Sequence, residues 1–255
     1  MTAIAAKTRD KRRWAKVEIA RYYKALQEAY GRQHWWPGRT RFEVILGTFL
    51  TQNTSWRNVE LALRNLRRAR ALSIAAIREL PEAELANLIR PSGYFRQKAK
   101  RIKNFVAHVD AGGGSLAGFL NGAELAVVRE RLLGLDGVGH ETADSILLYA
   151  ASRPTFVVDA YTRRVLERHG VINSGADYDE ARLLVEEAFA GAKLPLARDK
   201  NLGHKPTPMS RAKRSTLAQH YNEFHGLLVQ LGKRHCRKKN PECAGCPLER
   251  FLPLE

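Results

Sequence analysis

Asp159 is the side chain in this sequence best suited to chemistry, because it directly follows the apolar residues 156–158 and precedes a helical pattern. A carboxylate in such a place can stabilise a developing positive charge and help to activate water. It can equally cap the helix that follows. The two roles are compatible, because an N-cap position helps to keep a carboxylate ionised. Its position alone therefore leaves both roles open, with Asp159 as the candidate catalytic carboxylate.

Residues 132–149, LLGLDGVGHETADSILLY, contain a glycine-rich turn between two apolar segments. Gly137 and Gly139 flank Val138, so the backbone there can adopt positive φ and approach a partner closely. The amides of such a turn, and of the helix expected from His140, point outward and can bind a phosphate oxygen without reading base sequence. An ordinary turn between two helices is the alternative, since Gly-x-Gly alone is common.

The elements that must position these groups are all expected to be helices, because helical periodicity dominates and alternating strand patterns are almost absent. Helices are predicted over residues 14–30, 42–50, 54–68, 73–80, 82–89, 96–109, 118–121, 124–133, 140–151, 159–169, 178–190 and 210–233. Glycine and proline fall between them. Residues 193–213 are predicted to form a basic surface loop, either touching DNA or acting as a solvated linker.

The charge of the chain indicates a polyanionic partner. Its 255 residues suffice for one large or two smaller domains, and 43 Lys and Arg against 26 Asp and Glu give a net charge of +17. The excess gathers in residues 1–40 and 191–255. The sequence contains neither an apolar run of about 18 residues nor a lipidation signal, so we expect nucleic acid rather than a membrane.

Residues 1–14 are too charged for a secretory signal and are predicted to form a mobile basic arm. The three cysteines gather near the carboxyl end, which argues against a disulfide framework and indicates a reducing cytosol. We expect a cytoplasmic, nucleoid-associated monomer.

Several motifs together resemble the helix-hairpin-helix DNA glycosylases of the endonuclease III branch. They are LTQNTSW at 50–56, PSGYFRQKAKRIKNF at 91–105, LDGVGHETA at 135–143 and VVDAYTRR at 157–164, in the order and spacing of that family. The resemblance covers roughly residues 33–246. WWP at 35–37, TQNTSW, GHETAD and YNEFHG at 221–226 look most like the endonuclease III-like 3-methyladenine DNA glycosylases.

The resemblance implies two all-helical lobes with a DNA- and base-binding cleft between them and Asp159 near its mouth. Residues 33–153 would form the helix-hairpin-helix lobe of six helices. Residues 1–32, with the basic arm, and residues 154–255, with the cysteine-rich loop, would form the other lobe.

In this family, a lysine two residues after the second hairpin glycine forms a Schiff base in enzymes that also cut the DNA backbone. Here that position is Glu141, which has no amine. The resemblance therefore implies a monofunctional enzyme that leaves an abasic site, without AP lyase activity. His140 is too weak a substitute and is interpreted as a surface histidine near DNA phosphates.

A base inside a duplex must be flipped out before it is cut. Gln52 matches the glutamine that fills the vacated space, with Asn53 beside it, although a helix cap or polar turn is the alternative. The predicted base pocket comprises Trp35, Trp36, Pro37, Trp56 and Glu141. Tryptophan faces attract cationic alkylated purines by roughly 0.5–2 kcal/mol each. Trp36 is the ring more readily explained by core packing.

Cys236, Cys243 and Cys246 resemble the ligand run of an iron-sulfur cluster, whose fourth cysteine would stand at Leu252. The sequence leaves four alternatives open: a three-iron cluster, a four-iron cluster with another ligand such as His235, zinc, or no metal.

Basic side chains form the last group of candidates. Lys98, with Arg101 and Lys103, follows Gly93 in the pattern of a second backbone-contacting turn or lies on a solvated helix face. Arg163 and Arg164 clamp phosphates or pair with acidic neighbours. Lys233 is similar to a lysine of the alkyladenine sub-branch.

The sequence therefore predicts a monofunctional glycosylase that excises alkylated purines from damaged double-stranded DNA in base excision repair. A glycosylase of the same fold for oxidised or mismatched pyrimidines or uracil is the first alternative. A catalytically inactive, structure-specific DNA-binding protein is the second.

Overall fold

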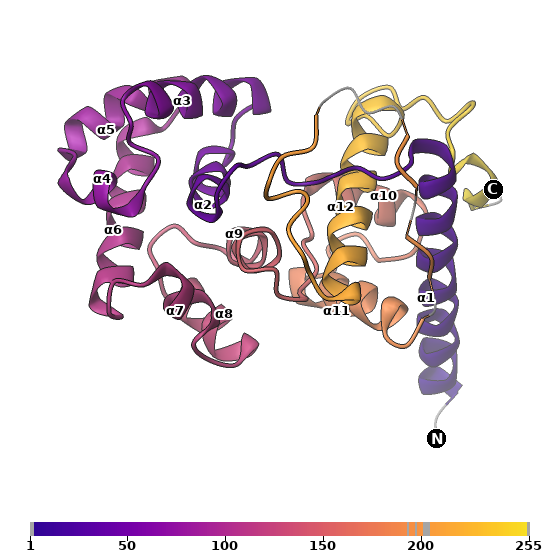
Figure 1. The fold of residues 1–255 in the computed structure, drawn as a ribbon. Helices are drawn as coiled ribbons and strands as arrows, with labels where there is room; N and C mark the ends of the chain where they lie inside the picture. Colours follow the sequence, from indigo (N-terminus) through magenta and orange to yellow (C-terminus); the bar gives the residue numbers. More distant parts are fainter. Residues whose placement is uncertain (1–2, 193, 197, 201–204, 254–255) are drawn as a thin grey trace. The chain divides into compact units, whose positions relative to one another are not determined.

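The computed structural model describes residues 3–192, 194–196, 198–200 and 205–253, and all regular structure in these ranges is helical (Figure 1). The predicted all-α class is therefore confirmed. The chain divides into two compact units. The central unit comprises residues 36–153 and 207–212, and the terminal unit comprises residues 1–35, 154–206 and 213–255.

The central unit is built from short helices. They are α2 (Arg41–Leu50), α3 (Trp56–Arg68), α4 (Ile74–Glu79), α5 (Glu82–Leu88), the 3-10 helix η1 (Arg90–Ser92), α6 (Phe95–Ala111), α7 (Leu116–Asn121), α8 (Leu125–Leu133), α9 (His140–Ser145) and the π-helix η2 (Ile146–Ala150). Helix α2 is buried from Phe42 to Leu50 and contacts α3, α6, α9 and η2. It is the centre around which this unit packs.

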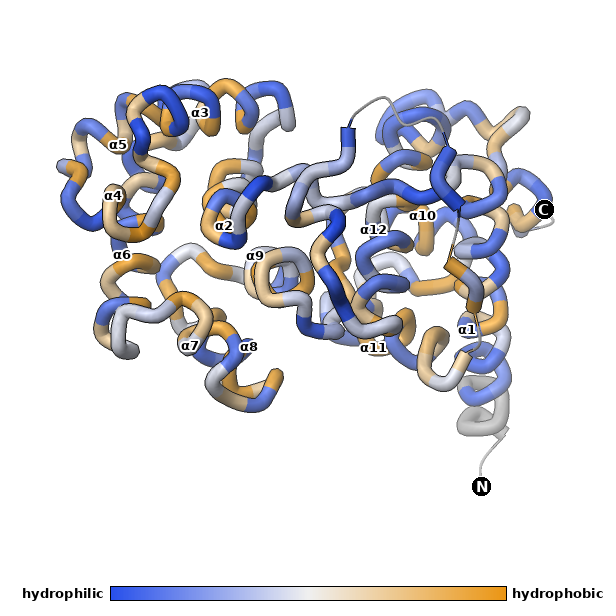
Figure 2. Tube along the Cα trace, in the orientation of Figure 1, coloured by the Kyte–Doolittle hydropathy of each residue, from blue (hydrophilic) through white to orange (hydrophobic). Residues whose placement is uncertain are grey.

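The terminal unit contains α1 (Ala3–Tyr30), α10 (Ala160–Arg168), α11 (Tyr178–Phe189), α12 (Thr216–Arg234) and the 3-10 helix η3 (Glu249–Phe251). Its core is aromatic: the ring of Phe224 lies 5.6 Å from Tyr23, 5.4 Å from Phe189 and 5.7 Å from Phe156. Hydrophobic and polar residues alternate along the helices of both units, as expected where each helix buries one face (Figure 2).

The prediction of a mobile basic arm at residues 1–14 is wrong for the residues that the structure describes. Helix α1 begins at Ala3, and the helix packs against α11. Arg12 donates to the Glu187 carboxylate at 2.6 and 3.0 Å, and Lys11 donates to Asn173 at 2.8 Å. Polar partners far along the chain, Glu187 and Asn173, thus bind basic side chains of this segment.

The last long helix begins later than predicted, at Thr216 rather than Ser210. Ser215 is the N-cap, and its hydroxyl accepts from the Ala218 amide at 3.2 Å. The preceding residues 207–212 form a turn of the central unit, where the Met209 amide donates to the Gly38 carbonyl at 3.3 Å. Six residues of the predicted loop, 193, 197 and 201–204, lie outside the described ranges.

Lys98 was expected on a solvated face or against the DNA backbone, and the structure contradicts both. Its side chain is 1% exposed, and the ammonium donates to the carbonyls of Leu50 at 2.9 Å and Ser92 at 2.7 Å. Burial, followed by the nearby Arg101 guanidinium, lowers the pKa of Lys98 to about 8. Lys98 joins the end of α2 to η1 and cannot present its charge to a phosphate.

Replacing Lys98 with methionine is therefore expected to destabilise the protein by about 2 kcal/mol or more, because two buried carbonyls lose their donor. Equilibrium denaturation measures the change. Lys100→Met is the matched control. Lys100 lies two residues further along the same helix with an exposed side chain, so its replacement should leave the midpoint unchanged. Equal midpoints for both variants would contradict the structural role of Lys98.

Candidate active site

Asp159 is the N-cap of α10, as its position before a helical pattern predicted. Its backbone is extended, and its Oδ1 accepts from the Thr162 amide at 2.7 Å. Its Oδ2 lies 3.5 Å from Nε2 of His225, and the Asp159 side chain is 14% exposed. The carboxylate is thus fixed on one side by the helix and the imidazole, and it remains within reach of solvent.

Opposing effects set the ionisation of Asp159. Burial disfavours the charged form, but the charge of His225, its hydrogen bond and the hydrogen bonds from Thr162 outweigh it, so the pKa of Asp159 lies below its ordinary value. The helix dipole acts in the same direction. Asp159 is a carboxylate at neutral pH, which is the state that electrostatic stabilisation of a cation requires.

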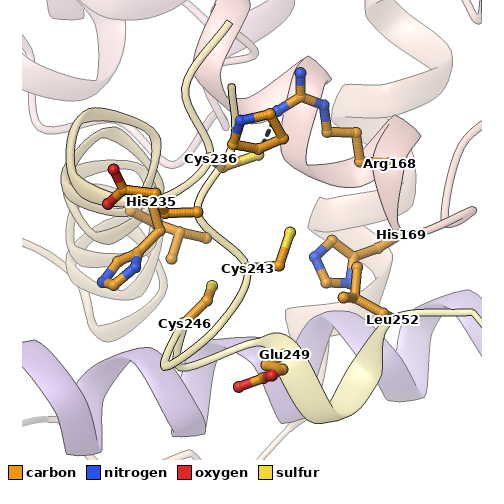
Figure 3. A pocket seen from close by; sticks show the side chains of 11 residues that line it. Arg168, His169, His235, Cys236, Cys243, Cys246, Glu249 and Leu252 are labelled. Atoms are coloured by element: carbon orange, nitrogen blue, oxygen red, sulfur yellow. Dashed lines mark hydrogen bonds between the residues drawn. The ribbon is translucent and has the colours of Figure 1, made fainter. Parts of the chain in front are cut away.

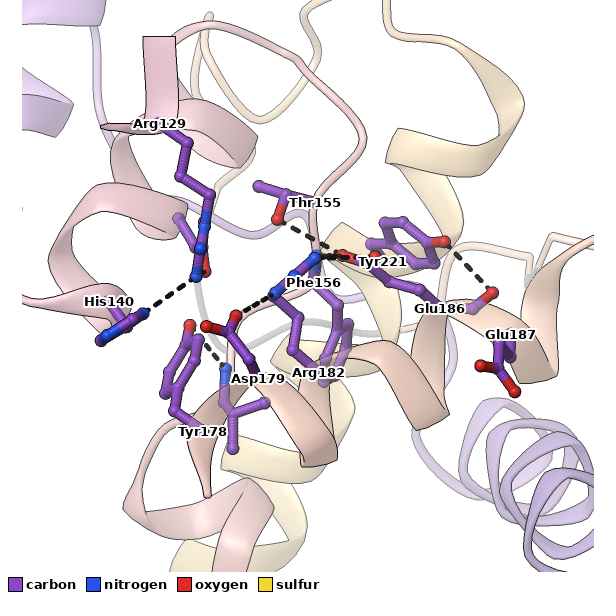
Figure 4. A network of polar contacts seen from close by, with 12 residues as sticks. Arg129, His140, Thr155, Phe156, Tyr178, Asp179, Arg182, Glu186, Glu187 and Tyr221 are labelled. Atoms are coloured by element: carbon purple, nitrogen blue, oxygen red, sulfur yellow. Dashed lines mark hydrogen bonds and ion pairs between the residues drawn. The ribbon is translucent and has the colours of Figure 1, made fainter. Parts of the chain in front are cut away.

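The segment that leads to Asp159 is held by α11 (Figure 4). The Glu186 carboxylate accepts from the Phe156 amide at 2.8 Å and from Arg182 at 2.8 and 2.9 Å. The Val158 amide donates to the Tyr178 hydroxyl at 3.3 Å. These bonds fix an extended segment without a neighbouring strand, and so they fix where α10 begins.

Trp35 lies beside the imidazole of this pair in the terminal unit. Its ring is 6.0 Å from His225, and the Lys233 ammonium lies 5.9 Å from its centroid. The approach of the Trp35 segment to α12 depends on Gly226, because a Cβ there would lie only 3.1 Å from the Trp35 Cβ. Asp159, His225 and Trp35 therefore form one local cluster, called here the Asp159 cluster.

The glycine-rich turn of the central unit has one residue with positive φ. Gly137 has φ +74°, and a Cβ there would collide with the Arg101 guanidinium. Gly139 was also expected to allow positive φ, but it is extended with φ −87° and is the N-cap of α9. Apart from its chain neighbours, no atom of the described residues lies within 4 Å of the Cβ position of Gly139, so this side of the turn is open.

Gln52 is bonded to this turn. Its amide nitrogen donates to the Gly137 carbonyl at 3.1 Å and to the Thr142 hydroxyl at 3.0 Å, and its oxygen accepts from Arg101 at 3.1 Å. Asn53, beside it, is exposed and has φ +53°. The predicted plug residue and the predicted phosphate grip therefore belong to one hydrogen-bonded group.

The remaining pocket candidates differ in exposure. Trp36 is 6% exposed and packs edge-on to Trp56 at 5.2 Å and against Tyr149 at 5.2 Å, which is the core packing considered for it. Trp56 is half-buried, and its indole donates to Glu60 at 3.0 Å. Pro37 is half-buried.

Around the turn, Val138 is buried, whereas His140 and Glu141 are exposed. His140 Nδ1 lies 3.1 Å from the Arg129 guanidinium (Figure 4). That guanidinium also binds the buried Asp144 at 2.8 Å. His140 and Glu141 thus lie at the surface of the first turn of α9.

The three cysteines line one cavity in the terminal unit, with His169, His235 and Leu252 also at its wall (Figure 3). Arg168 donates to the Cys236 sulfur at 3.4 Å. Burial, and after it the neighbouring thiols, raises the pKa of Cys246. In the described part of the chain, no group of three or more His, Cys, Asp or Glu side chains is arranged to hold a single metal ion.

Two comparisons identify the family. The profile of the HhH-GPD superfamily base excision DNA repair proteins matches residues 46–190. The chain is 42% identical over 240 residues to the "Putative DNA repair glycosylase" of Methanocaldococcus jannaschii, covering 91% of this chain and 94% of that protein. The chain belongs to the HhH-GPD superfamily. The resemblance to the helix-hairpin-helix glycosylases is thereby confirmed.

Other HhH-GPD relatives agree. Endonuclease III of Thermotoga maritima is 28% identical over 209 residues, which cover 82% of this chain and 80% of that protein. The structure of H. pylori 3-methyladenine DNA glycosylase bound to 1,N6-ethenoadenine superposes with a TM-score of 0.67 at 29% identity, covering 86% of this chain and 97% of the other.

Arg163 and Arg164 of this HhH-GPD protein both have protein partners. Arg163 donates to the Ala176 carbonyl at 2.5 Å and lies 3.6 Å from Glu167, which is the acidic pairing considered for it. Arg164 donates to the Cys236 carbonyl at 2.7 Å and lies over the Tyr161 ring. Both arginines therefore interact with other groups of the protein itself in this structure.

Two residues of the Asp159 environment were missed from the sequence. His225 was quoted within YNEFHG but was given no role, and Glu186 was not singled out. The signal available in the sequence for His225 was a histidine within a largely apolar helical pattern. Glu186 offered none, because the segment that it holds lies about thirty residues earlier in the chain. In the described ranges, no helix combines the length and the apolar character needed to cross a bilayer.

Proposed function

We propose that this DNA repair glycosylase releases alkylated purines of the 3-methyladenine type from double-stranded DNA and leaves an abasic site without cutting the backbone. The observation that carries the proposal is the Asp159 cluster, in which an ionised carboxylate pairs with His225 and the His225 ring lies 6.0 Å from the Trp35 ring. The H. pylori relative, named for 3-methyladenine and solved with an ethenoadenine, supports the substrate class.

The chemistry follows from the charge of the carboxylate. As the N-glycosidic bond breaks, its electron pair goes to the base, which neutralises a cationic alkylpurine and leaves positive charge on the sugar. Asp159 stabilises that charge, and water adds to the sugar carbon and gives up its proton to the surrounding solvent. A cationic base is a good leaving group, so little acid catalysis is required.

The ring of Trp35 gives a reason for selecting a cationic base. A tryptophan face attracts a cation, and the Lys233 ammonium already lies 5.9 Å from this ring. Trp56 belongs to the other unit, and its role as a second stacking face remains a prediction, as do those of Trp36, Pro37 and Glu141. Gln52 would fill the space that the flipped base leaves.

His225 is proposed as a positioning residue that keeps Asp159 ionised. Activity rises with pH as Asp159 loses its proton, and since its pKa lies below the ordinary value, the rate should be flat above about pH 5. In His225→Gln, burial acts on Asp159 without the opposing imidazole, so the acidic limb should move to higher pH. Single-turnover rates between pH 4 and 8 measure this.

His220→Gln is the matched control for this shift. His220 is a buried histidine on the same helix, but it is bonded to the Tyr23 hydroxyl at 2.8 Å. Its replacement should reduce stability and leave the pH profile in place. An unchanged acidic limb in His225→Gln would remove His225 from the proposal.

The absence of AP lyase activity is tested by borohydride trapping on DNA that contains an abasic site. The side chain at the Schiff-base position is Glu141, so no covalent complex and no strand cleavage beyond that of the buffer are expected. A lysine-bearing endonuclease III serves as the positive control. A trapped complex would show that another amine forms the Schiff base and would contradict the monofunctional assignment.

Base release from defined duplexes tests the substrate class. The proposal expects mass-detected release of 3-methyladenine or ethenoadenine, and no release of thymine glycol or uracil above background. The reverse preference would assign the protein to the pyrimidine glycosylases of the same fold. Release of no base would favour an inactive DNA-binding protein.

A further inference from the structure

Glu223 is a buried carboxylate of α12 that holds the residues leading to Trp35. Its side chain is 1% exposed, and its Oε2 accepts from the Gln33 amide at 2.7 Å. Its Oε1 accepts from the Gln219 side chain at 2.8 Å and from the Arg32 guanidinium at 3.3 Å. Both oxygens of one carboxylate are thus occupied, and one of them binds the backbone two residues before Trp35.

Keeping this carboxylate charged is costly. Burial raises the pKa of Glu223, and the bonds from the Gln33 amide and Arg32 oppose that effect only in part. A buried ion pair is often no more stabilising than well-packed apolar side chains of similar volume. The chemistry assigned to Asp159 does not use the Glu223 charge. What the charge supplies is direction, because a carboxylate with fixed donors at both oxygens holds those donors in place.

The backbone between Gln33 and Trp35 needs such support. His34 has φ +49°, in the left-handed region that residues other than glycine seldom adopt. A conformation of this kind persists only where the surroundings fix it. Glu223 fixes the Gln33 amide, and the His34 Nε2 atom lies 2.8 Å from the Asp199 carboxylate. The residues that directly precede Trp35 are therefore held by two separate contacts.

Gly226 brings the same segment directly against α12. It stands three residues after Glu223, so the two positions share one face of the helix. A Cβ at Gly226 would lie 3.1 Å from the Cβ atoms of Gln33 and Trp35, which is closer than ordinary van der Waals contact. The ring of Trp35 lies 6.0 Å from that of His225 on this helix. Glu223 and Gly226 therefore act on the same few residues.

We propose that Glu223 is a positioning residue that sets the place of the Trp35 ring beside His225 and thereby the recognition of the flipped purine. It acts through the Gln33 backbone and not by contact with the base. The inference rests on the proposed function, because it takes Trp35 as a ring that stacks on the base. Displacing such a ring weakens the binding of ground state and transition state alike, so it changes saturation rather than the maximal rate.

Glu223→Gln is the first test, because glutamine keeps the shape of the side chain. An amide has a single acceptor oxygen, so the donors of Gln33, Arg32 and Gln219 can no longer all be satisfied. With an ethenoadenine duplex, the protein concentration that gives half the maximal single-turnover rate should rise about tenfold, and the maximal rate should stay within about threefold. Affinity for a duplex with an abasic site, which has no base to stack, should not change.

Glu186→Gln is the matched control. Glu186 is also a carboxylate that accepts from a backbone amide, that of Phe156 at 2.8 Å, and from an arginine side chain at 2.9 Å. It holds the segment before Asp159 instead of the segment before Trp35. Its replacement should therefore lower the maximal rate and leave the half-saturating concentration unchanged, which is the opposite split.

A double-mutant cycle separates positioning from a general loss of stability. Trp35→Ala removes the ring, so in that background Glu223→Gln should add little to the half-saturating concentration. Gly226→Ala is a second variant for the case that Glu223→Gln folds poorly. Alanine is favoured over glycine inside a helix, while its methyl group presses on the Trp35 segment, so the half-saturating concentration should rise in a folded protein.

Fluorescence without DNA tests the position of the ring apart from the substrate. The Trp35 emission, taken as the difference from matching proteins that carry Trp35→Phe, should shift in Glu223→Gln and not in Glu186→Gln. An unshifted Trp35 emission in a folded Glu223→Gln protein would overturn the proposal, and so would additive effects in the double-mutant cycle. A shifted emission in a protein whose wild type releases no purine would support the positioning of Trp35 and contradict the proposed function alone.

Discussion

Asp159→Asn is expected to slow base release by about 10²–10³-fold and to leave DNA affinity within a few-fold. Asparagine keeps the shape of the side chain and can still cap α10, because its carbonyl oxygen accepts from the Thr162 amide. The variant loses only the negative charge that would face the developing cation. Single-turnover base release and equilibrium binding to damaged duplex measure the two effects separately.

Asp177→Asn is the matched control for this experiment. Asp177 is also an N-cap aspartate, and its carboxylate accepts from the Glu180 amide of α11 at 2.6 Å, but it is exposed and no histidine pairs with it in the described contacts. Its replacement should leave the rate unchanged. Wild-type turnover in Asp159→Asn would overturn the catalytic assignment, and a parallel loss in both variants would reduce Asp159 to a structural cap.

The features that could be predicted from the sequence are those that local chemistry decides. The helices follow from their periodicity, and the cap at Asp159 follows from an aspartate that stands before a helical pattern. The positive φ of Gly137 was also within reach. The extended Gly139 was not, because a glycine permits positive φ without requiring it.

The features that were missed depend on contacts between distant residues. His225 lies in a helix far along the chain from Asp159, and no local pattern joins them. Lys98 is different, because Lys98, Ile102, Phe105 and Val109 share the buried face of α6 at helical spacing. The helical periodicity indicates that Lys98 lies on the buried face of the helix, whereas its charge suggests a position at the protein surface. Hydrogen bonds to two backbone carbonyls compensate for the burial of that charge.

Helix α10 connects Asp159 with the loop that carries the cysteines, and both lie in the terminal unit. It begins at Asp159, which the helix holds through its N-cap bond, and it ends at His169, whose ring is fixed by the Phe251 carbonyl. Between them, Arg164 and Arg168 bind the backbone around Cys236. The cysteine loop therefore supports the helix that positions the carboxylate.

Gly137→Ala and Gly139→Ala are expected to separate the stability of the glycine-rich turn from its binding of DNA. At Gly137 an alanine meets both positive φ and the Arg101 guanidinium, so the turn should lose about 1–3 kcal/mol. Displacing Arg101 also breaks its bond to Gln52. Denaturation should show the loss of stability, and base release should fall with it.

Gly139→Ala should behave in the opposite way. Its φ of −87° suits alanine, and in the described part of the chain no atom beyond the neighbouring residues lies within 4 Å of the new methyl group, so stability should stay within about 1 kcal/mol of wild type. The methyl group would project into the open space from which, as we propose, a DNA phosphate approaches the first amides of α9. DNA affinity should therefore fall about tenfold, or 1.4 kcal/mol, in a variant that is fully folded. Wild-type affinity in Gly139→Ala would mean that the backbone of this turn does not contact DNA.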